Sequence, residues 1–256
     1  MRDKSVIEIE KELTTYTMEK LDEIIPALLC DERKSVRDLG KRMLRRVKSQ
    51  REEYERINRM KEIEAGLRKK GFTVIAGIDE AGRGPLCGPV VAAAVILPEG
   101  FFVPGVNDSK KLSPQRREEL FLEITEKCLD YAVGMVDSRE IDRINILNAT
   151  YKAVDIAIGR LNLTPQCLVL DAIKLPGCSM YQESVIKGDQ KCLSVAAASI
   201  IAKVERDRYM AKVHGLYPEY NFESNKGYGT KEHIDAILKH GPCSEHRITF
   251  LRNIPF

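Results

Sequence analysis

Paired carboxylates follow an apolar run in the first half of the chain. The stretch VIAGIDEAGRGPLCGPVVAAAVIL covers residues 74 to 97 and places Asp79 and Glu80 just before a glycine-rich turn. The residues ahead of Asp79 are nearly all apolar, which is typical of a central strand covered on both faces. Because burying a charge is costly, an acid at such a strand end either meets a cation or faces a cleft where it can hold a metal ion.

The same pattern occurs twice more. In CLVLDA an apolar run ends at Asp171, and in SVIKGDQ a short apolar run passes through Lys187 and Gly188 to Asp189. If the three strand ends share one edge of a sheet, these side chains form an oxygen-only cluster that favours Mg²⁺ or Mn²⁺. Two such ions can activate water and stabilise a leaving oxygen in phosphodiester hydrolysis. None of the four histidines is near these acids in sequence, which argues against zinc chemistry there.

A structural interpretation competes with the catalytic one. A single acid at a strand end is more often a turn former or a helix cap. We assign Asp207 and Glu205 to that class, as exposed helix residues, with Asp207 able to pair with Lys203 or Arg206. Three strand-terminal sites together favour a metal centre.

The turn after Glu80 contains Gly82, Arg83 and Gly84. A dinucleotide-binding GxGxxG motif would need glycine at position 87, where the chain has Cys87, and no GK[ST] follows for a phosphate loop. Without a Cβ at positions 82 and 84, the backbone can approach a ligand closely and hydrogen-bond a ribose 2′-OH, the group that separates RNA from DNA. The alternative is a tight hairpin that needs glycine for positive φ.

The elements that would position these residues form two regions. Residues 6 to 70 have helical spacing of apolar side chains, whereas short β-rich runs begin after Gly71, which predicts a domain boundary near residue 70. A short link between the first two strands predicts an antiparallel hairpin in a mixed sheet of an α/β domain. Expected strands are 72 to 79, 90 to 98, 131 to 137 and 167 to 172; expected helices begin at Ser113-Pro114, run from a Ser138 cap to Arg160, and span 193 to 214.

Composition places the protein among soluble globular chains. Its seven cysteines are scattered and include no CxxC pair, which argues against a disulfide framework or a zinc site and favours the cytoplasm. There is neither a secretory signal nor an apolar run of about 20 residues, so we expect no membrane association. Residues 33 to 70 carry 15 Lys/Arg against 6 Asp/Glu, which indicates either contact with nucleic acid or a solvated helix face.

Six motifs follow one another along the chain: GIDEAGRGPLCGPVVAAAVIL, DSKKLS, LVLDA, KGD before SVAAASIIAKVERD, YPEYNFESNKGYGTKEH and GPCSEHRITF. Together they resemble bacterial ribonuclease HII, of the type 2 ribonuclease H family. The resemblance spans about residues 71 to 250 and fits ribonuclease HII better than ribonuclease HIII, because GRGP follows DEA. It implies a ribonuclease H-like mixed β-sheet flanked by helices, with residues 71 to 256 as the catalytic domain and 1 to 70 as a basic helical extension whose role the family does not supply.

The resemblance also implies roles for individual residues. Asp79, Glu80, Asp171 and Asp189 would bind the two metal ions and be catalytic, while Gly82, Arg83 and Gly84 would read the 2′-OH. Tyr228 would stack on the sugar of the following deoxynucleotide, although it could also be a packed loop aromatic. Further plausible phosphate contacts are Lys187, Lys203 and Arg206.

The expected function is therefore an endonuclease with two Mg²⁺ or Mn²⁺ ions. It would cut the RNA strand of RNA/DNA hybrids and cut 5′ to single ribonucleotides in duplex DNA, leaving 3′-hydroxyl and 5′-phosphate ends. We expect a monomer, and the sequence does not identify any replication partner. Two alternatives stay open: a two-metal nuclease for all-DNA substrates, such as a junction resolvase, and a nucleic-acid-binding protein whose acids are structural.

Overall fold

The chain forms two compact units, Met1–Asn58 and Arg59–Phe256. The computed structural model describes residues 4 to 255. The first unit is helical, and apolar side chains from all three of its helices pack into one core. Its helices are α1 (Val6–Leu13), α2 (Met18–Leu29) and α3 (Lys34–Met60), the last of which ends in the second unit.

The second unit is built on a mixed sheet of five strands in the order β3-β2-β1-β4-β5. Strand β1 (Ile75–Ala81) pairs antiparallel with β2 (Val90–Ile96), as the short link predicts, and β2 pairs antiparallel with β3 (Asp130–Val136). On its other side β1 runs parallel to β4 (Cys167–Asp171), which in turn runs parallel to β5 (Tyr181–Val185). The mixed sheet that the sequence predicts is therefore confirmed.

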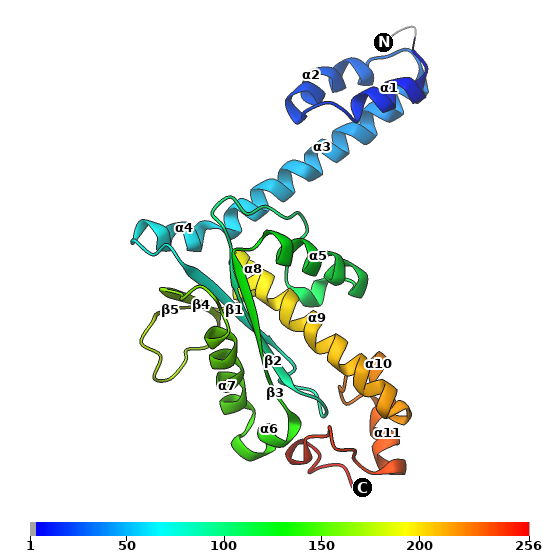
Figure 1. The fold of residues 1–256 in the computed structure, drawn as a ribbon. Helices are drawn as coiled ribbons and strands as arrows, with labels where there is room; N and C mark the ends of the chain where they lie inside the picture. Colours follow the sequence, from blue (N-terminus) through cyan, green and yellow to red (C-terminus); the bar gives the residue numbers. More distant parts are fainter. Residues whose placement is uncertain (1–3, 256) are drawn as a thin grey trace. The chain divides into compact units, whose positions relative to one another are not determined.

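Helices cover both faces of this sheet (Figure 1). The long helix α9 (Leu193–Leu216) packs on β1 and β2 from one side, and α7 (Ile146–Gly159) packs on β2 and β3 from the other. All seven residues of β2 are buried, as a strand covered on both faces requires. Gly77 allows the close approach of α9, because a Cβ there would lie 2.3 Å from the backbone of Ser194.

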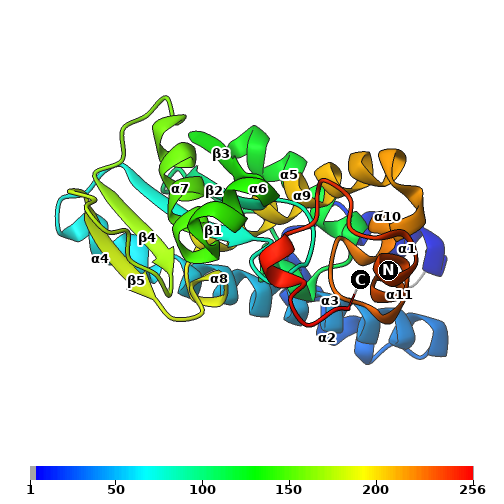
Figure 2. The same cartoon turned by 90° about the horizontal axis from the view of Figure 1, so that it is seen from below.

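The remaining helices surround these layers. Ser113 caps α5 (Pro114–Lys127) through the N–H of Arg116, as predicted from the Ser-Pro pair. A separate apolar cluster joins residues of α9, of the C-terminal helices α10 (Phe222–Asn225) and α11 (Lys231–His240), and Leu251. The C-terminal segment lies beside α10 and α11 (Figure 2). The other elements are α4 (Glu62–Lys69), η1 (Ser109–Lys111), α6 (Ser138–Ile144), α8 (Gly188–Lys191), η2 (Pro218–Tyr220) and η3 (Ile248–Phe250).

The single helix expected between Ser138 and Arg160 is wrong. The structure has two helices there, and Asp137 rather than Ser138 is the N-cap of the first. They are separated by Asn145, which has φ of 68° and whose side chain accepts a hydrogen bond from the N–H of Asn148. Asparagine tolerates this left-handed region and is a strong N-cap, so one residue ends α6 and starts α7.

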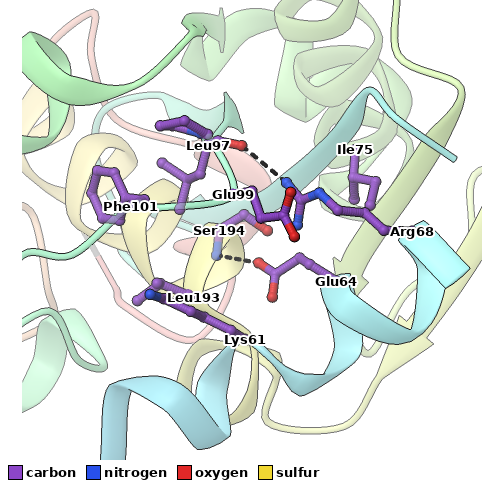
Figure 3. A pocket seen from close by; sticks show the side chains of 10 residues that line it. Lys61, Glu64, Arg68, Ile75, Leu97, Glu99, Phe101, Leu193 and Ser194 are labelled. Atoms are coloured by element: carbon purple, nitrogen blue, oxygen red, sulfur yellow. Dashed lines mark hydrogen bonds between the residues drawn. The ribbon is translucent and has the colours of Figure 1, made fainter. Parts of the chain in front are cut away.

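Helix α4 lies within the expected N-terminal extension, yet it belongs to the compact unit that contains the sheet. Leu67 on α4 packs with Ile75 of β1 and Cys167 of β4. The carboxylate of Glu64 accepts a hydrogen bond at 2.9 Å from the N–H of Ser194 in the first turn of α9, beside a small pocket (Figure 3). The contacts therefore divide the chain between residues 58 and 59. The predicted boundary near residue 70 marks instead where the sequence changes from helical to β-rich patterns.

Candidate active site

Three aspartates from separate elements meet beside the carboxyl ends of the parallel strands. Asp79, Asp171 and Asp189 each offer a carboxylate oxygen, and these atoms all lie within 4.8 Å of one another. Asp171 is the last residue of β4, as expected. Asp79 lies inside β1 opposite Ala93, because the strand continues to Ala81, and Asp189 lies on the short helix α8 rather than on a strand end.

Local hydrogen bonds fix two of these carboxylates. Oδ1 of Asp171 accepts from the N–H of Gly188 at 2.8 Å, which ties the end of β4 to the start of α8. Oδ1 of Asp79 accepts from the N–H of Glu80 at 2.8 Å, and the Ser199 hydroxyl of α9 also donates to Asp79. The Ser199 oxygen lies 2.9 Å from the hydroxyl oxygen of Ser109, so η1 and α9 together support the buried acid.

The electrostatics of the cluster favour a bound cation. Burial and the neighbouring Glu80 carboxylate raise the pKa of Asp79 well above its ordinary value. Burial also raises the pKa values of Glu80 and Asp189, with Asp171 adding to both shifts. Like charges that cannot all be solvated are relieved by a divalent ion, and an all-carboxylate donor set suits Mg²⁺ or Mn²⁺. The residues present therefore fit the metal that the sequence implies.

Glu80 lies at the edge of this group. Its carboxylate lies 3.1 Å from a guanidinium nitrogen of Arg83, which is exposed, and it interacts electrostatically with Asp171. Gly82 has φ of 93°, and a Cβ there would lie 2.1 Å from Nε of Arg206. Glycine at 82 is thus required by the close packing of Arg206, whereas Gly84 is exposed and has open space where a Cβ would be.

The structure contradicts the assignment of Arg206 as a phosphate contact. Arg206 is completely buried, and its guanidinium donates to the carbonyl oxygens of Cys87, Pro89 and Lys226 at 2.9 to 3.0 Å. In the sequence Arg206 is a basic residue of a predicted helix with no visible partner, but here it joins the glycine-rich loop to the segment before Tyr228. Arg206 therefore supports the glycine-rich loop from the protein interior.

The other two residues proposed as phosphate contacts, Lys187 and Lys203, differ in exposure and in pairing. Lys187 is exposed and has left-handed backbone geometry directly before α8. Lys203 is partly buried and lies 2.7 Å from a carboxylate oxygen of Asp207. Asp207 itself is largely buried rather than exposed, and it also faces Arg117 at 3.5 Å. Tyr228 has 46% of its surface exposed, with the Arg206 guanidinium 5.9 Å from its ring centre.

Lys110 belongs to the site but was not selected from the sequence. Its Nζ lies 4.0 Å from a carboxylate oxygen of Asp189. Burial works against its charge, but the carboxylates of Asp108, Asp79 and Asp189 outweigh it and raise the pKa of Lys110. The only signal in the sequence is its place in DSKKLS, because no local pattern shows that η1 packs beside α8 and α9.

Family profiles and known proteins are similar to this chain in sequence. The family profile described as Ribonuclease HII matches residues 76–253, and the profile described as Ribonuclease HII N-terminal domain matches residues 5–68. Ribonuclease HII of Clostridioides difficile is 49% identical over 99% of this chain and 100% of its own length. Ribonuclease HII of Caldanaerobacter subterraneus is 54% identical over 79% of this chain and 84% of its own length.

Solved structures of related enzymes have a similar fold. Ribonuclease H2 from Pyrococcus horikoshii has a TM-score of 0.59 at 31% identity and covers 71% of this chain and 97% of its own. The PCNA:RNase HII complex from Archaeoglobus fulgidus has a TM-score of 0.58 at 27% identity, with the same two coverages. Because one profile spans most of the chain and a relative matches over its whole length, the chain belongs to the ribonuclease HII family.

Proposed function

We propose that this ribonuclease H cuts the RNA strand of RNA/DNA hybrids and cuts 5′ to single ribonucleotides within duplex DNA. The observation that carries the proposal is the approach of the Asp79, Asp171 and Asp189 carboxylates to within 4.8 Å of one another. We propose that these three residues and Glu80 hold two Mg²⁺ or Mn²⁺ ions. When bound, such ions supply Lewis acidity and charge stabilisation for phosphodiester hydrolysis, which leaves 3′-hydroxyl and 5′-phosphate ends.

The protein residues would bind and orient the substrate and the metal ligands. Rigid support favours catalysis because donors and acceptors need no reorganisation in the transition state. Support of this kind comes to Asp79 from Ser199 and from the N–H of Glu80, and to Asp171 from the N–H of Gly188. Lys110, beside Asp189, would limit the repulsion of the carboxylates before ions bind.

Substrate recognition is proposed for the loop at residues 82 to 84. Its Gly84 and Arg83 are exposed beside Glu80, so backbone groups here can reach a ribose 2′-OH. We propose that the exposed ring of Tyr228 stacks on the next sugar, and that Lys187 contacts phosphate. Lys203 is a weaker candidate because Asp207 already pairs with it.

The decisive experiment is a matched pair of duplexes. One is DNA with a single ribonucleotide, the other is the same sequence in DNA only, and each is incubated with Mg²⁺ or with EDTA. Cleavage only of the first duplex, only with Mg²⁺, and at the bond 5′ to the ribonucleotide is the expected result. Cleavage of the all-DNA duplex would favour a resolvase-like nuclease, and binding without cleavage under any condition would favour a binding protein.

We propose a cytoplasmic monomer. A partner similar to PCNA is suggested only by the complex from Archaeoglobus fulgidus. Within residues 4 to 255, no helix has both the length and the apolar character needed to cross a bilayer.

A further inference from the structure

A second group of metal-ligating side chains lies away from the acidic cluster. Cys87 follows the glycine-rich loop, and Cys243 and His246 lie in the GPCSEH segment near the end of the chain. The Sγ atoms of both cysteines and a ring nitrogen of His246 all lie within 4.8 Å of one another. Cys87 and His246 are also opposite residues in an isolated antiparallel bridge, so the backbone holds the two segments together.

The spacing of the group is close to that of a bound zinc ion. With Zn–S of about 2.3 Å and Zn–N of about 2.0–2.1 Å in a tetrahedron, sulfur and nitrogen ligands lie roughly 3.6 Å apart. Sγ of Cys243 and Nδ1 of His246 are 3.2 Å apart. Cys243 and His246 are the first and fourth residues of a turn closed by the N–H of His246 and the carbonyl of Cys243, which separates two ligands as a CxxC zinc motif does.

Backbone groups fix the proton positions on two imidazoles. The N–H of Cys243 donates to Nδ1 of His246 at 2.9 Å, so this nitrogen carries no proton and Nε2 must carry one. At the other end, Nδ1 of His233 donates to the carbonyl of Tyr228 at 2.9 Å. Nε2 of His246 therefore donates to Nε2 of His233 at 3.0 Å. A metal-binding histidine almost always donates its other ring N–H to a fixed acceptor, as His246 does here.

Two buried positive charges lie beside the group. The guanidinium groups of Arg206 and Arg247 are buried beside Cys87 and donate to the carbonyls of Cys87 and Gly88. Within the described part of the chain neither of them forms an ion pair with a carboxylate. Burial raises the pKa of the Cys87 thiol, and the nearby arginine charge offsets only part of that effect. A bound cation would supply the remaining positive charge that a buried thiolate needs. Cys243 is partly exposed, which gives an ion a path to the two buried ligands.

We propose that Cys87, Cys243 and His246 form a site for a thiolate-preferring divalent cation, Zn²⁺ above all, which links the glycine-rich loop to the C-terminal segment. On binding, each thiol releases its proton to solvent, and Nδ1 of His246 exchanges its hydrogen bond from the N–H of Cys243 for the metal ion. Three protein ligands leave the fourth position to water. The absence of a CxxC pair hides this site in the sequence, because its ligands come from segments far apart in the chain.

The test uses the full-length protein, reduced, stripped with EDTA and then titrated with Zn²⁺ or Co²⁺ alone. We expect Co²⁺ to give a thiolate-to-cobalt charge-transfer band in the near ultraviolet, which carboxylate ligands do not produce. Zn²⁺ should abolish the band by displacement. Asp171→Asn should keep it, which separates this site from the acidic cluster, and Mg²⁺-dependent cleavage reports on that cluster independently.

Cys243→Ser is the main variant because Cys243 is partly exposed, and Cys128→Ser is its matched control at a partly exposed cysteine outside the group. We expect Cys243→Ser to lose the band and to bind Zn²⁺ at least tenfold more weakly, with Cys128→Ser unchanged. His233→Gln should weaken Zn²⁺ binding by about 10–100-fold, as loss of a partner that orients a ligand does. Circular dichroism checks that each variant is folded.

Three results would overturn the proposal. The first is the absence of a charge-transfer band in the reduced wild-type protein. The second is a band that survives in folded Cys243→Ser. The third combines two findings. Mass spectrometry of protein isolated without reductant would show a Cys87–Cys243 disulfide, and the reduced protein would retain no added Zn²⁺.

Discussion

The Glu64 carboxylate accepts a hydrogen bond from the backbone N–H of Ser194 at 2.9 Å (Figure 3). Cys192, the N-cap of α9, makes no side-chain capping hydrogen bond, so Glu64 on α4 caps this long helix from another element. Because α9 also carries Ser199, the cap supports the helix that holds Asp79 in place.

Replacing this cap should lower stability. We expect Glu64→Ala to reduce the free energy of unfolding by about 0.5–2 kcal/mol, the usual cost of losing an N-cap. For a protein of this size that is a fall in Tm of roughly 2–4 °C per kcal/mol. Glu64→Gln keeps an acceptor oxygen and is the matched control. Equal Tm values for wild type and Glu64→Ala in thermal unfolding would show that the bond contributes nothing.

Removing one carboxylate of the cluster should abolish cleavage. We expect Asp171→Asn to reduce Mg²⁺-dependent kcat by about 10³-fold or more, since several kcal/mol of transition-state stabilisation depend on the bound ions. Asp235→Asn, at an exposed position of α11, is the control and should retain activity. Single-turnover cleavage of a hybrid, with hybrid binding measured separately, checks both. Wild-type turnover by purified Asp171→Asn would refute the assignment.

Stability should depend on pH through Asp79. Its pKa is raised in the folded protein, so between the unfolded value near 3.8 and the folded value the native state binds more protons than the unfolded state. Stability contributed by the protonated form is therefore lost as pH rises through this window. Without metal, we expect Asp79→Asn to have a higher Tm than wild type at neutral pH and no advantage below about pH 4.

The comparison needs two controls. Asp235→Asn should show no such pH-dependent gain. Mg²⁺ should raise the Tm of the wild type and not that of Asp79→Asn, because an ion that binds only the folded state stabilises it. A Tm of Asp79→Asn below that of wild type in EDTA at neutral pH would contradict the prediction.

Tyr228 should contribute mainly through its ring. Stacking of a base on an aromatic side chain is worth about 1–3 kcal/mol, and contact of the ring with a sugar buries surface of the same order. We therefore expect Tyr228→Ala to lower kcat/KM on a single-ribonucleotide duplex by roughly 5–150-fold. Tyr228→Phe keeps the ring and should stay near wild type. A kcat/KM measurement that shows equal losses in both variants would point to the hydroxyl instead.

The N-terminal region is expected to strengthen duplex binding through charge. Exposed basic residues on α3 include Arg45 and Arg46. The binding constant for duplex should fall with rising salt, and replacing both arginines by Gln should make this fall less steep. In a plot of log K against log salt, the magnitude of the slope should decrease by about 0.9 for each phosphate that the protein no longer neutralises. Truncation should stop after residue 58, because removal of residues 59 to 70 would also remove Glu64. An unchanged affinity and salt slope would favour the solvated-face interpretation.

Local patterns in the sequence were enough to identify four of the five strands of the sheet, the Ser113-Pro114 helix start and the apolar runs that lead to Asp79 and Asp171, because strand and cap preferences depend on neighbours in the chain. Strand β5, Tyr181–Val185, was not among the expected strands. The long motifs were enough to indicate the family. They could not show the break at Asn145, where one residue's backbone geometry overrides a continuous helical pattern.

Only the tertiary structure decided which charges are buried and what they meet. The sequence suggested Arg206 as a phosphate contact, yet it lies wholly inside the protein and donates to three carbonyls. Lys110 beside Asp189, and Cys87 beside Cys243 and His246, are neighbours only because the chain folds distant segments together. A sequence records residue types and local spacing, whereas pKa values, ligand sets and ion pairs depend on distances across the fold.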